Sequence, residues 1–289
     1  MSPPVNRTSV PATINYYLDP SLGGGETLSK LEPHEMQIHD IRGSEGDFTL
    51  DTHGFQVVQH GVRVDPEDFA DDGRRENLYA ETAGIVKKAT GASRVMPISH
   101  LHRQQSHVDS VAAKSVSPDS MKTIGPAMVA HVDQSYQGAV ALLNDKLASE
   151  AEKASRTRWA IVNVWIPLHF PVPREPLAVC DARSVDEQDL VEQALVFRGA
   201  FKSAFKGVSQ GSGCGMWKVR YNSKHQWYYK SHLGTQEAIL LKIFDSKLDG
   251  RARRCPHSAF KLPNQDEKAP ARESVETRCL VFWDDQSAE

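Results

Sequence analysis

The sequence predicts a mainly β fold with α-helices packed on its outside. Short apolar segments separated by Gly, Pro, Asn and Asp recur along most of the chain, which is typical of strands joined by turns. Two longer segments instead place apolar residues at helical spacing, with charges between them. With 289 residues, of which 39% are hydrophobic, the chain is long enough for one sizeable core, and we expect residues 1–289 to form a single domain.

The composition argues against several classes of protein. The formal net charge is −3, whereas a nucleic-acid-binding surface needs a clear excess of Lys and Arg, so no nucleic-acid partner is expected. No apolar run is long enough for a membrane-spanning helix or a signal peptide, which favours a cytosolic protein without a membrane partner. The four cysteines form no C-x-x-C pair, which favours reduced thiols over disulfides.

The first 120 residues predict strands and one long helix. Residues 1–12 carry three prolines among small polar residues and are expected to be a flexible terminus. Asp65 is a suitable N-cap for the segment with helical spacing, and Gly91 is a suitable residue to end it. The helix is expected over residues 66–90, and strands over residues 13–18, 36–41, 48–50, 54–59 and 94–98.

Residues 100–120 are polar and contain three histidines, His100, His102 and His107. Three histidines suggest a metal site, but the flanking Gln, Ser and Lys residues favour a solvated, mobile loop. Long loops often cover a site. The functional alternative is therefore a lid that becomes ordered over the site when substrate binds.

The second half of the chain predicts further strands around a second helix. Residues 136–154 place Ala, Val and Leu at helical spacing opposite charged residues, so this helix should pack outside the strands. Asn222 and Ser223 suggest the turn of a hairpin. A short acidic helical turn is expected at residues 186–191 and a loop at residues 201–215. Strands are expected over residues 127–132, 160–167, 177–180, 216–221, 226–230 and 237–244, with the last two beginning at His257 and Arg272.

His131 and Asp133 are two residues apart in an extended segment, so their side chains project from the same face and can bind one metal ion. An H-x-D tripeptide alone is weak evidence, because the chain contains 12 histidines and the alternative is a solvated turn. His257, which opens another short apolar segment, is the candidate for the third ligand. Two histidines and one carboxylate leave the opposite positions of the metal open, as in non-heme Fe(II) oxygenases.

Arg272 and Ser274 begin a final segment that alternates polar and apolar residues, so they share one face of the expected strand. A guanidinium group beside a hydroxyl group suits a carboxylate that is held away from the metal. The far carboxylate of 2-oxoglutarate fits this description.

Three longer segments are residues 125–135 (GPAMVAHVDQS), 163–168 (NVWIPL) and 176–185 (PLAVCDARSV). Together with shorter matches, such as residues 50–56 (LDTHGFQ) and 272–276 (RESVE), they extend over nearly the whole chain. These segments resemble the fungal hydroxylase/desaturase family of Fe(II)/2-oxoglutarate-dependent oxygenases, the gibberellin desaturase, aspergillic-acid hydroxylase and cephem 7-hydroxylase type.

The resemblance implies a double-stranded β-helix core, which is jelly-roll or cupin-like, with amphipathic helices outside it. We expect this core in residues 121–289 and an N-terminal extension in residues 1–120. Residue by residue, His131, Asp133 and His257 match the family's metal ligands, and Arg272 matches its co-substrate arginine. The implied cofactors are Fe(II), 2-oxoglutarate and O2, with ascorbate as a stimulant.

The expected activity is hydroxylation of an unactivated C–H bond of a small secondary-metabolite substrate, coupled to decarboxylation of 2-oxoglutarate to succinate and CO2. Desaturation or oxidative cyclisation by the same iron centre is the alternative, because a motif does not fix the placement of the substrate carbon. A metal-dependent hydrolase and a non-catalytic binding protein on the same fold are further alternatives. A monomer or a homodimer is expected.

Four further residues are candidates for contact with the substrate. Asn163 and Trp165 share a face of one expected strand, although a tryptophan there is commonly part of the core. Arg183 suits an anionic group, and an intramolecular ion pair is its alternative. Arg278 lies on the co-substrate face of the last strand, where Glu276 forms either a supporting pair or a surface pair with it.

The chain departs from the family pattern in one place. The family tends to carry paired arginines just after the strand expected over residues 94–98, whereas here Arg103 is followed by Gln104 and Gln105. The substrate contact of those arginines is therefore not carried over to this chain.

Overall fold

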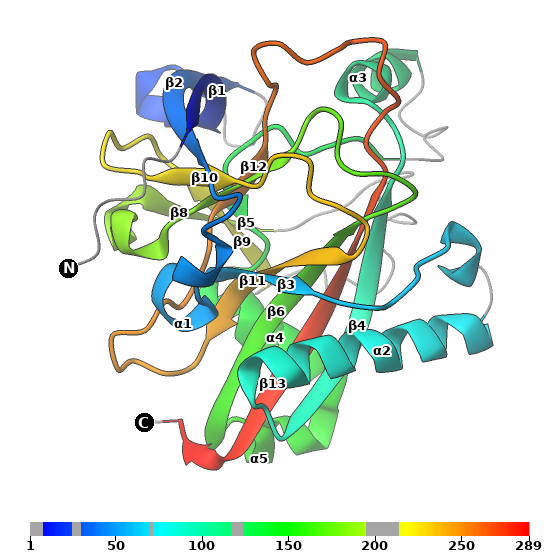
Figure 1. Ribbon diagram of the computed structural model, residues 1–289. Coiled ribbons are helices and arrows are strands. Elements are labelled where there is room, and N and C mark those ends of the chain that lie inside the picture. The colour runs from blue at the N-terminus through cyan, green and yellow to red at the C-terminus, as the bar shows by residue number, and fades with distance from the viewer. Residues whose placement is uncertain (1–7, 25–29, 70–71, 117–123, 195–213, 289) are drawn as a thin grey trace.

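The computed structural model describes residues 8–24, 30–69, 72–116, 124–194 and 214–288, and its strands form two sheets (Figure 1). The five-stranded sheet is antiparallel throughout and has the order β3-β11-β6-β13-β4. Its strands are β3 (Phe55–Gln59), β11 (Glu237–Asp245), β6 (Thr157–Pro167), β13 (Ser274–Ser287) and β4 (Arg94–Arg103).

The eight-stranded sheet has the order β1-β2-β10-β7-β12-β5-β9-β8, and β10 and β2 form its parallel pair. This sheet curls against the first and gives the predicted jelly-roll arrangement, so the expected fold class is confirmed. Its strands are β1 (Ser9–Tyr17), β2 (Leu31–Asp40), β10 (Trp227–Tyr229), β7 (Leu177–Cys180), β12 (His257–Ala259), β5 (His131–Val132), β9 (Gly215–Val219) and β8 (Leu190–Ala194).

Strand β6 shows why the two sheets enclose a common core. Trp159, Ile161 and Trp165 point into the cluster between the sheets, while Ala160 and the alternate residues after it point to the other face. This period of two is the ordinary alternation of a strand that is buried on both faces. Polar residues at inward positions of β6 and β13 therefore lie inside the molecule.

Helices cover the sheets from outside and close the core. Helix α2 (Asp72–Thr90) crosses the outer face of the five-stranded sheet (Figure 1), and Val86 joins the apolar cluster there. Helix α4 (Tyr136–Leu147) buries Ala139, Leu142 and Leu143 in the core between the sheets. The other helical segments are α1 (Leu50–His53), α3 (His107–Val116), α5 (Ala151–Ala154) and 3-10 turns at Pro20–Leu22, Glu45–Asp47, Pro66–Phe69, Ala148–Glu150, Ala182–Ser184 and Glu187–Asp189.

Helix α4 approaches β9 so closely that both contact positions are glycine. A Cβ atom placed on Gly138 would lie 2.1 Å from the carbonyl oxygen of Gly215, and one on Gly215 would lie 2.6 Å from Oγ of Ser135. Ser135 is also the N-cap of α4. These contacts fix the helix directly after the segment that carries His131 and Asp133.

The structure corrects several expected elements in the first part of the chain. Residues 9–12 belong to β1 instead of a flexible terminus. Residues 48–50 do not form a strand, because Thr49 caps helix α1 by accepting a hydrogen bond from the backbone N–H of Thr52. The helix over residues 66–90 begins with a separate 3-10 turn, although it ends before Gly91 as expected. Residues 100–116 are not a polar loop, since they belong largely to β4 and α3.

Two further expectations fail in the second part. The strands near Asn222 form no hairpin, because β9 pairs with β5 and β8, whereas β10 pairs with β2 and β7. The helix expected over residues 136–154 is interrupted at Ala148, whose φ of 46° is left-handed. The loop expected over residues 201–215 falls mostly outside the described residues.

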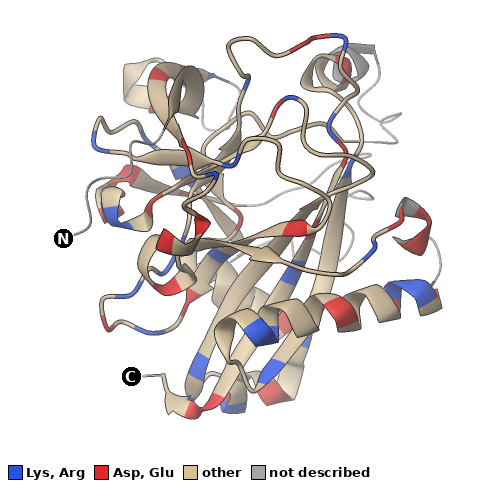
Figure 2. Cartoon of the chain, viewed as in Figure 1, with Lys and Arg blue, Asp and Glu red and all other residues tan. Residues whose placement is uncertain are grey.

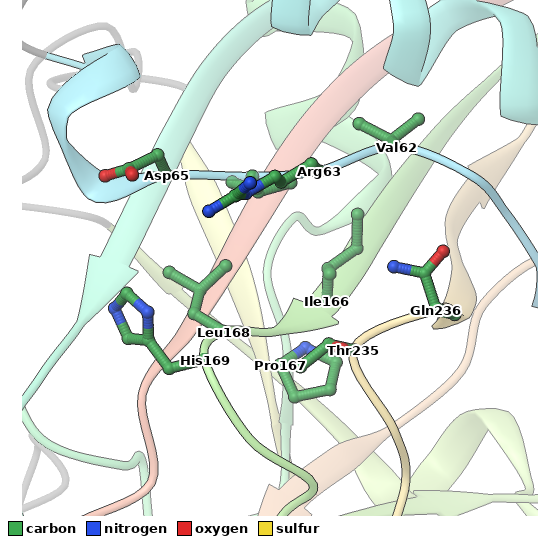
Figure 3. Close-up of a pocket in the computed structure, with 10 residues that line it drawn as sticks. Val62, Arg63, Asp65, Ile166, Pro167, Leu168, His169, Thr235 and Gln236 are labelled. Carbon is green, nitrogen blue, oxygen red and sulfur yellow. The ribbon is translucent and has the colours of Figure 1, made fainter.

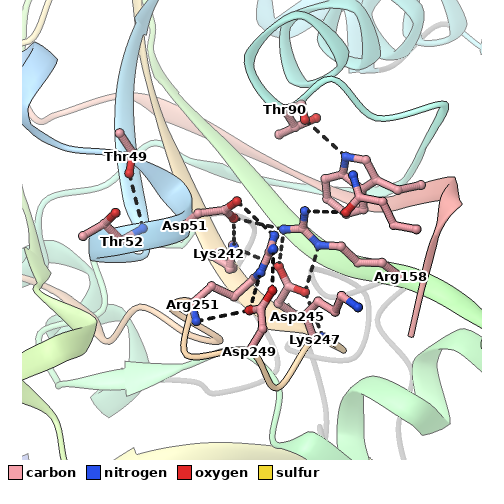
Figure 4. A network of polar contacts seen from close by, with 12 residues as sticks. Thr49, Asp51, Thr52, Thr90, Arg158, Lys242, Asp245, Lys247, Asp249 and Arg251 are labelled. Carbon is pink, nitrogen blue, oxygen red and sulfur yellow. Dashed lines mark hydrogen bonds and ion pairs between the residues drawn. The ribbon is translucent and has the colours of Figure 1, made fainter. Parts of the chain in front are cut away.

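A network of charged side chains joins β6, β11 and α1 at the end of β6 that lies away from Pro167 (Figure 4). Arg158 donates hydrogen bonds of 3.2 and 2.7 Å to Asp245, and Lys242 donates one of 2.8 Å. Asp51 of α1 accepts further bonds from Arg158, Lys242 and Arg251. Because Asp245 is fully buried, its two cationic partners compensate for the hydration that its side chain loses in the core.

Charges of both signs are intermixed along helix α2 and over the surrounding segments (Figure 2). All four cysteines are buried and unbridged. In the described part of the chain, no helix has the length and apolar composition needed to cross a membrane.

Candidate metal and co-substrate site

Strands β5 and β12 bring the three predicted metal ligands together. The two strands are antiparallel neighbours with His131 opposite His257, and Asp133 follows directly after β5. Oδ1 of Asp133 lies 3.5 Å from Nε2 of His131 and 3.9 Å from Nε2 of His257. One ligand atom from each of the three residues lies within 4.8 Å of the other two. Two imidazoles and one carboxylate at this spacing can hold one divalent metal ion.

Backbone carbonyl groups fix the tautomers of both histidines. Nδ1 of His131 lies 2.8 Å from the carbonyl oxygen of Val129, and Nδ1 of His257 lies 3.0 Å from that of Cys255. A carbonyl oxygen only accepts, so each Nδ1 must carry the proton and donate it. Each Nε2 then presents a lone pair to the space beside Asp133, as a metal-binding imidazole requires.

The second carboxylate oxygen of Asp133 is held by two donors. Nδ2 of Asn163 donates to Oδ2 at 2.6 Å, and a guanidinium nitrogen of Arg278 donates to the same atom at 2.9 Å. Oδ1 is thereby left facing the two histidines. Asn163 and Arg278 thus contact the carboxylate of the triad, a role that differs from the substrate contact expected for both.

The charges of the triad suit a cation. Burial raises the pKa of Asp133, but Arg278 and the two histidines outweigh it and hold that pKa well below its ordinary value. Burial and the neighbouring His131 lower the pKa of His257 to about 4, so its imidazole is neutral near pH 7. Burial also lowers the pKa of His131, yet its contact with Asp133 raises it above the ordinary value. A metal ion would displace a proton from this pair.

Arg272 lines the same cavity as the two histidines of the triad, and both Arg272 and Ser274 have buried polar atoms that lack partners among the described residues. Arg272 is 2% exposed, precedes β13 by two residues, and donates to the carbonyl oxygen of Glu175 at 2.9 Å. Its guanidinium carbon lies 5.1 Å from the ring centre of Trp165. Nε of Arg272 and Oγ of Ser274 have no hydrogen-bond partner among the described residues. Buried donors without partners are costly, so this donor set fits a ligand with a carboxylate group.

One cavity joins these groups. It has an empty volume of about 270 Å³ and is lined by the two histidines of the triad, by Arg272 and by their neighbours. The lining residues are Arg103, Ala127, His131, Trp165, Leu177, His257, Ala259, Arg272 and Glu276. Trp165 therefore forms a wall of the site as well as part of the core.

Comparison with known proteins matches the chain to one family over nearly its whole length. A family model described as an oxidoreductase/YMDC permease-like domain covers residues 2–282. The hydroxylase/desaturase efuI of Hormonema carpetanum is 39% identical over 100% of this chain and 100% of its own length. The hydroxylase/desaturase CTB9 of Cercospora beticola is 42% identical over 96% of this chain and 87% of its own length.

A solved structure has the same fold, and the name of that protein states the cofactors that it uses. The iron and alpha-ketoglutarate-dependent endoperoxidase NvfI superposes with a TM-score of 0.74 at 28% identity, over 96% of this chain and 97% of that one. The chain belongs to the fungal hydroxylase/desaturase family of Fe(II)/2-oxoglutarate-dependent oxygenases. As a member of this family it is an oxidoreductase that uses Fe(II), 2-oxoglutarate and O2 and acts on a small molecule.

Arg183 lies apart from the oxygenase cavity. It forms a two-pronged ion pair with Asp181, at 2.6 Å between the closest atoms, and its side chain is 58% exposed. Of the two alternatives for Arg183, the structure therefore contains the intramolecular ion pair.

Glu276 and Arg278 do not form the surface pair that was one of their two alternatives, because both side chains are buried. Arg278 contacts Asp133 instead.

Among the described residues, the three histidines of the expected loop are not gathered with other ligands into a metal site. His100 contacts the hydroxyl group of Tyr79 at 2.8 Å, and His102 contacts Glu273 at 2.7 Å. His107 begins α3, with its backbone N–H donating to the carboxylate of Glu175. The same stretch brings Arg103 into the oxygenase cavity, which was not predicted from the sequence.

A larger cavity lies at the end of β6, between the segments that follow β3 and precede β11, and outside the triad (Figure 3). It has an empty volume of about 770 Å³ and contains no member of the triad. Its walls come from residues 62–65, residues 166–169 and the residues Thr235 and Gln236. Its greater size does not make it the site of chemistry, because the donor set for a metal lies in the smaller cavity.

Proposed function

We propose that the protein hydroxylates an unactivated C–H bond of a small secondary metabolite, coupled to decarboxylation of 2-oxoglutarate to succinate and CO2. One observation carries the proposal. The ligand atoms of His131, Asp133 and His257 converge, and the two histidines line the same cavity as Arg272; two residues further on, Ser274 has a buried hydroxyl group without a partner among the described residues. A metal-ion site and a carboxylate site so close together suit a chelating 2-oxo diacid.

Each residue has a distinct part in this proposal. His131, Asp133 and His257 would hold Fe(II), and Arg272 with Ser274 would bind the far carboxylate of 2-oxoglutarate. Bound iron, with 2-oxoglutarate and O2, supplies the oxidising power that no side chain has. The protein contributes by fixing the imidazole tautomers, holding one oxygen of Asp133 away from the metal and excluding bulk water.

Desaturation or oxidative cyclisation is the second candidate outcome. It is supported by the relatives, which are named hydroxylase/desaturase, and by the structural neighbour, which is named an endoperoxidase. We favour hydroxylation because it needs only one well-placed C–H bond. A metal-dependent hydrolase or a non-catalytic protein gains no support from these relatives.

A screen of small metabolites for stimulated succinate release tests the proposal. Protein loaded with Fe(II) should release succinate only when 2-oxoglutarate is present, and a true substrate should increase the release. Mass spectrometry then separates the outcomes, since hydroxylation adds one oxygen atom and desaturation removes two hydrogen atoms. Metal-loaded protein that releases no succinate across a broad screen would contradict the proposal.

Other expectations stay predictions from the sequence. They are stimulation by ascorbate, a monomeric or homodimeric state, a cytosolic location, the absence of nucleic-acid and membrane partners, and a single domain over residues 1–289. The lid expected over residues 100–120 also stays a prediction, although its residues up to 116 form strand and helix.

A further inference from the structure

Glu175 is a buried residue whose backbone has the left-handed conformation. Its φ is 49°, and the residue is 4% exposed. In the described part of the chain, the other non-glycine residues with positive φ are all exposed, namely Ala148, His169 and His232. A residue with a Cβ atom is strained in this conformation, and the following Pro176 favours extended backbone at Glu175 instead. Glu175 therefore keeps its conformation only because its surroundings hold it.

Contacts of the side chain and of the backbone hold Glu175 in place. Its carboxylate accepts the backbone N–H of His107, the first residue of α3, with 3.3 Å to each oxygen. The dipole of α3 stabilises a negative charge at this end of the helix. The backbone N–H of Glu175 donates to Oε1 of Gln265 at 3.2 Å. The side chain thus anchors a strained backbone to a helix that is remote from it in the sequence.

The carbonyl group of Glu175 holds the guanidinium group of Arg272. Its oxygen accepts a hydrogen bond of 2.9 Å from Arg272, which lines the oxygenase cavity and whose Nε has no partner among the described residues. The direction of a carbonyl group is set by the backbone torsions of its own residue. If Glu175 relaxed to extended backbone, this acceptor would turn away from Arg272. The left-handed conformation of Glu175 therefore fixes the position of the guanidinium group in the cavity.

We propose that Glu175 is a positioning residue for binding of the co-substrate. Its carboxylate, anchored to the N-terminus of α3, holds the left-handed backbone whose carbonyl group orients Arg272 toward the far carboxylate of 2-oxoglutarate. This inference rests on the proposed function of the same site. It gives a reason for a buried glutamate at a backbone position that glycine would adopt without strain.

Two substitutions of Glu175 separate the backbone from the carboxylate. Glu175→Ala and Glu175→Gly both remove the carboxylate, but only glycine keeps the left-handed conformation without strain. The affinity of Mn(II)-loaded protein for 2-oxoglutarate is measured by calorimetry in the absence of turnover. Glu175→Ala should weaken this binding by about 10-fold, because the backbone relaxes and Arg272 loses its acceptor. Glu175→Gly should bind 2-oxoglutarate as tightly as wild type.

Pyruvate shows whether the effect is confined to Arg272. It has the 2-oxo acid group of 2-oxoglutarate but lacks the far carboxylate, so its affinity should be the same in wild type and in both variants. The affinity for Mn(II) should also stay at the wild-type value, because Glu175 is not one of the three metal ligands.

His232→Ala is the matched control. His232 has a φ of 47°, and its carbonyl oxygen accepts a hydrogen bond of 2.8 Å from Arg42, but the residue is exposed and does not line the oxygenase cavity. The substitution should leave all three affinities unchanged. Glu175→Gln replaces Glu175→Ala if the alanine protein does not fold. Its amide oxygen still accepts from His107 but carries no charge, so the affinity for 2-oxoglutarate should fall by about threefold.

Three outcomes would overturn the inference. One is an unchanged affinity for 2-oxoglutarate in Glu175→Ala, or in the glutamine variant that replaces it. Another is an equal loss in Glu175→Gly, which would assign the effect to the carboxylate instead of the backbone. The third is weaker binding of pyruvate or Mn(II), which would make Glu175 a general support of the site. The proposed function fails separately, if wild-type protein loaded with Mn(II) does not bind 2-oxoglutarate or if Arg272→Ala binds it as tightly as wild type.

Discussion

At the scale of single residues, the geometry of the site depends on which atom of each side chain already forms a hydrogen bond within the protein. The carbonyl groups of Val129 and Cys255 occupy Nδ1 of the two histidines, and Asn163 and Arg278 occupy Oδ2 of Asp133. The remaining atoms, two Nε2 and one Oδ1, face one another. The orientation of the triad is therefore set before any metal ion arrives, which lowers the entropic cost of binding.

Arg278→Met tests whether this orientation matters. It removes one of the two donors to Oδ2 of Asp133, so the carboxylate is less firmly oriented. We expect the affinity for a divalent metal to fall by about 10- to 100-fold, as for other residues that orient metal ligands. Equilibrium titration with Mn(II) measures the change, and Arg183→Gln is the matched arginine control. Equal affinities in Arg278→Met and wild type would show that Asn163 alone positions Asp133.

Arg272→Ala should separate metal binding from co-substrate binding. Its guanidinium group makes no contact with Asp133, so the metal affinity should stay at the wild-type value. The dissociation constant of 2-oxoglutarate should rise by about 100-fold, because a charge-assisted contact is lost. Activity should recover at high 2-oxoglutarate concentration. Loss of the metal in this variant would mean that Arg272 supports the metal ligands instead of binding the co-substrate.

At the scale of elements, the sequence predicted the strands whose positions depend on the local pattern of apolar residues. Strands β7, β11 and β12 lie where their apolar segments indicated, and two of the three triad residues are neighbours in the sequence. The hairpin near Asn222 was wrong because its strands pair with distant partners. Arg103 was missed as a residue of the cavity for the same reason, since the register of β4 on β13 cannot be inferred from either segment alone.

Glu276, a buried acid on the inward face of β13, should make the stability of the protein depend on pH. Burial and the charge of Asp133 raise the pKa of Glu276 from 4.5 to about 7. Between these values the folded protein keeps a proton that the unfolded chain has released, so the free energy of unfolding should fall as the pH rises from about 4.5 to 7. The full effect is on the order of 3 kcal/mol, at roughly 1.4 kcal/mol per unit of pKa.

Glu276→Gln should abolish this contribution. Chemical denaturation of the metal-free protein should show the variant gaining stability over wild type as the pH rises through that window. Ser274→Ala, a change without a titrating group at the next inward position of β13, should give a difference that does not vary with pH. A constant difference for Glu276→Gln would show that this carboxyl group ionises normally.

At the scale of the whole molecule, charged clusters lie at two places along β6 and serve different purposes. The cluster around Asp245 is saturated with partners, since Arg158 and Lys242 both contact its carboxylate (Figure 4). In the oxygenase cavity, by contrast, Arg272 keeps a buried nitrogen without a partner among the described residues, and so does the hydroxyl group of Ser274 two residues further on. Buried charged groups whose hydrogen bonds are all made within the protein stabilise the fold. Buried polar groups that lack partners indicate that a ligand supplies them.

Asp245→Ala should therefore be among the more destabilising substitutions. It leaves Arg158 and Lys242 in the core without their buried counter-ion, which costs about 3–5 kcal/mol of unfolding free energy. Asp249→Ala, which removes an acid with a 44% exposed side chain from the same network, should cost less than about 1 kcal/mol. Urea denaturation compares the two variants, and similar losses would mean that the network acts as a surface cluster.

The most direct test of the account is an anaerobic titration of 2-oxoglutarate into wild-type protein and Asp133→Ala, each with and without Fe(II). The account predicts that wild-type protein binds one equivalent of 2-oxoglutarate tightly when one equivalent of Fe(II) is present. Omitting the metal should weaken this binding strongly, and so should removing the carboxylate of Asp133. Tight, stoichiometric binding of Fe(II) and 2-oxoglutarate to Asp133→Ala would contradict the claim that His131, Asp133 and His257 form the iron site.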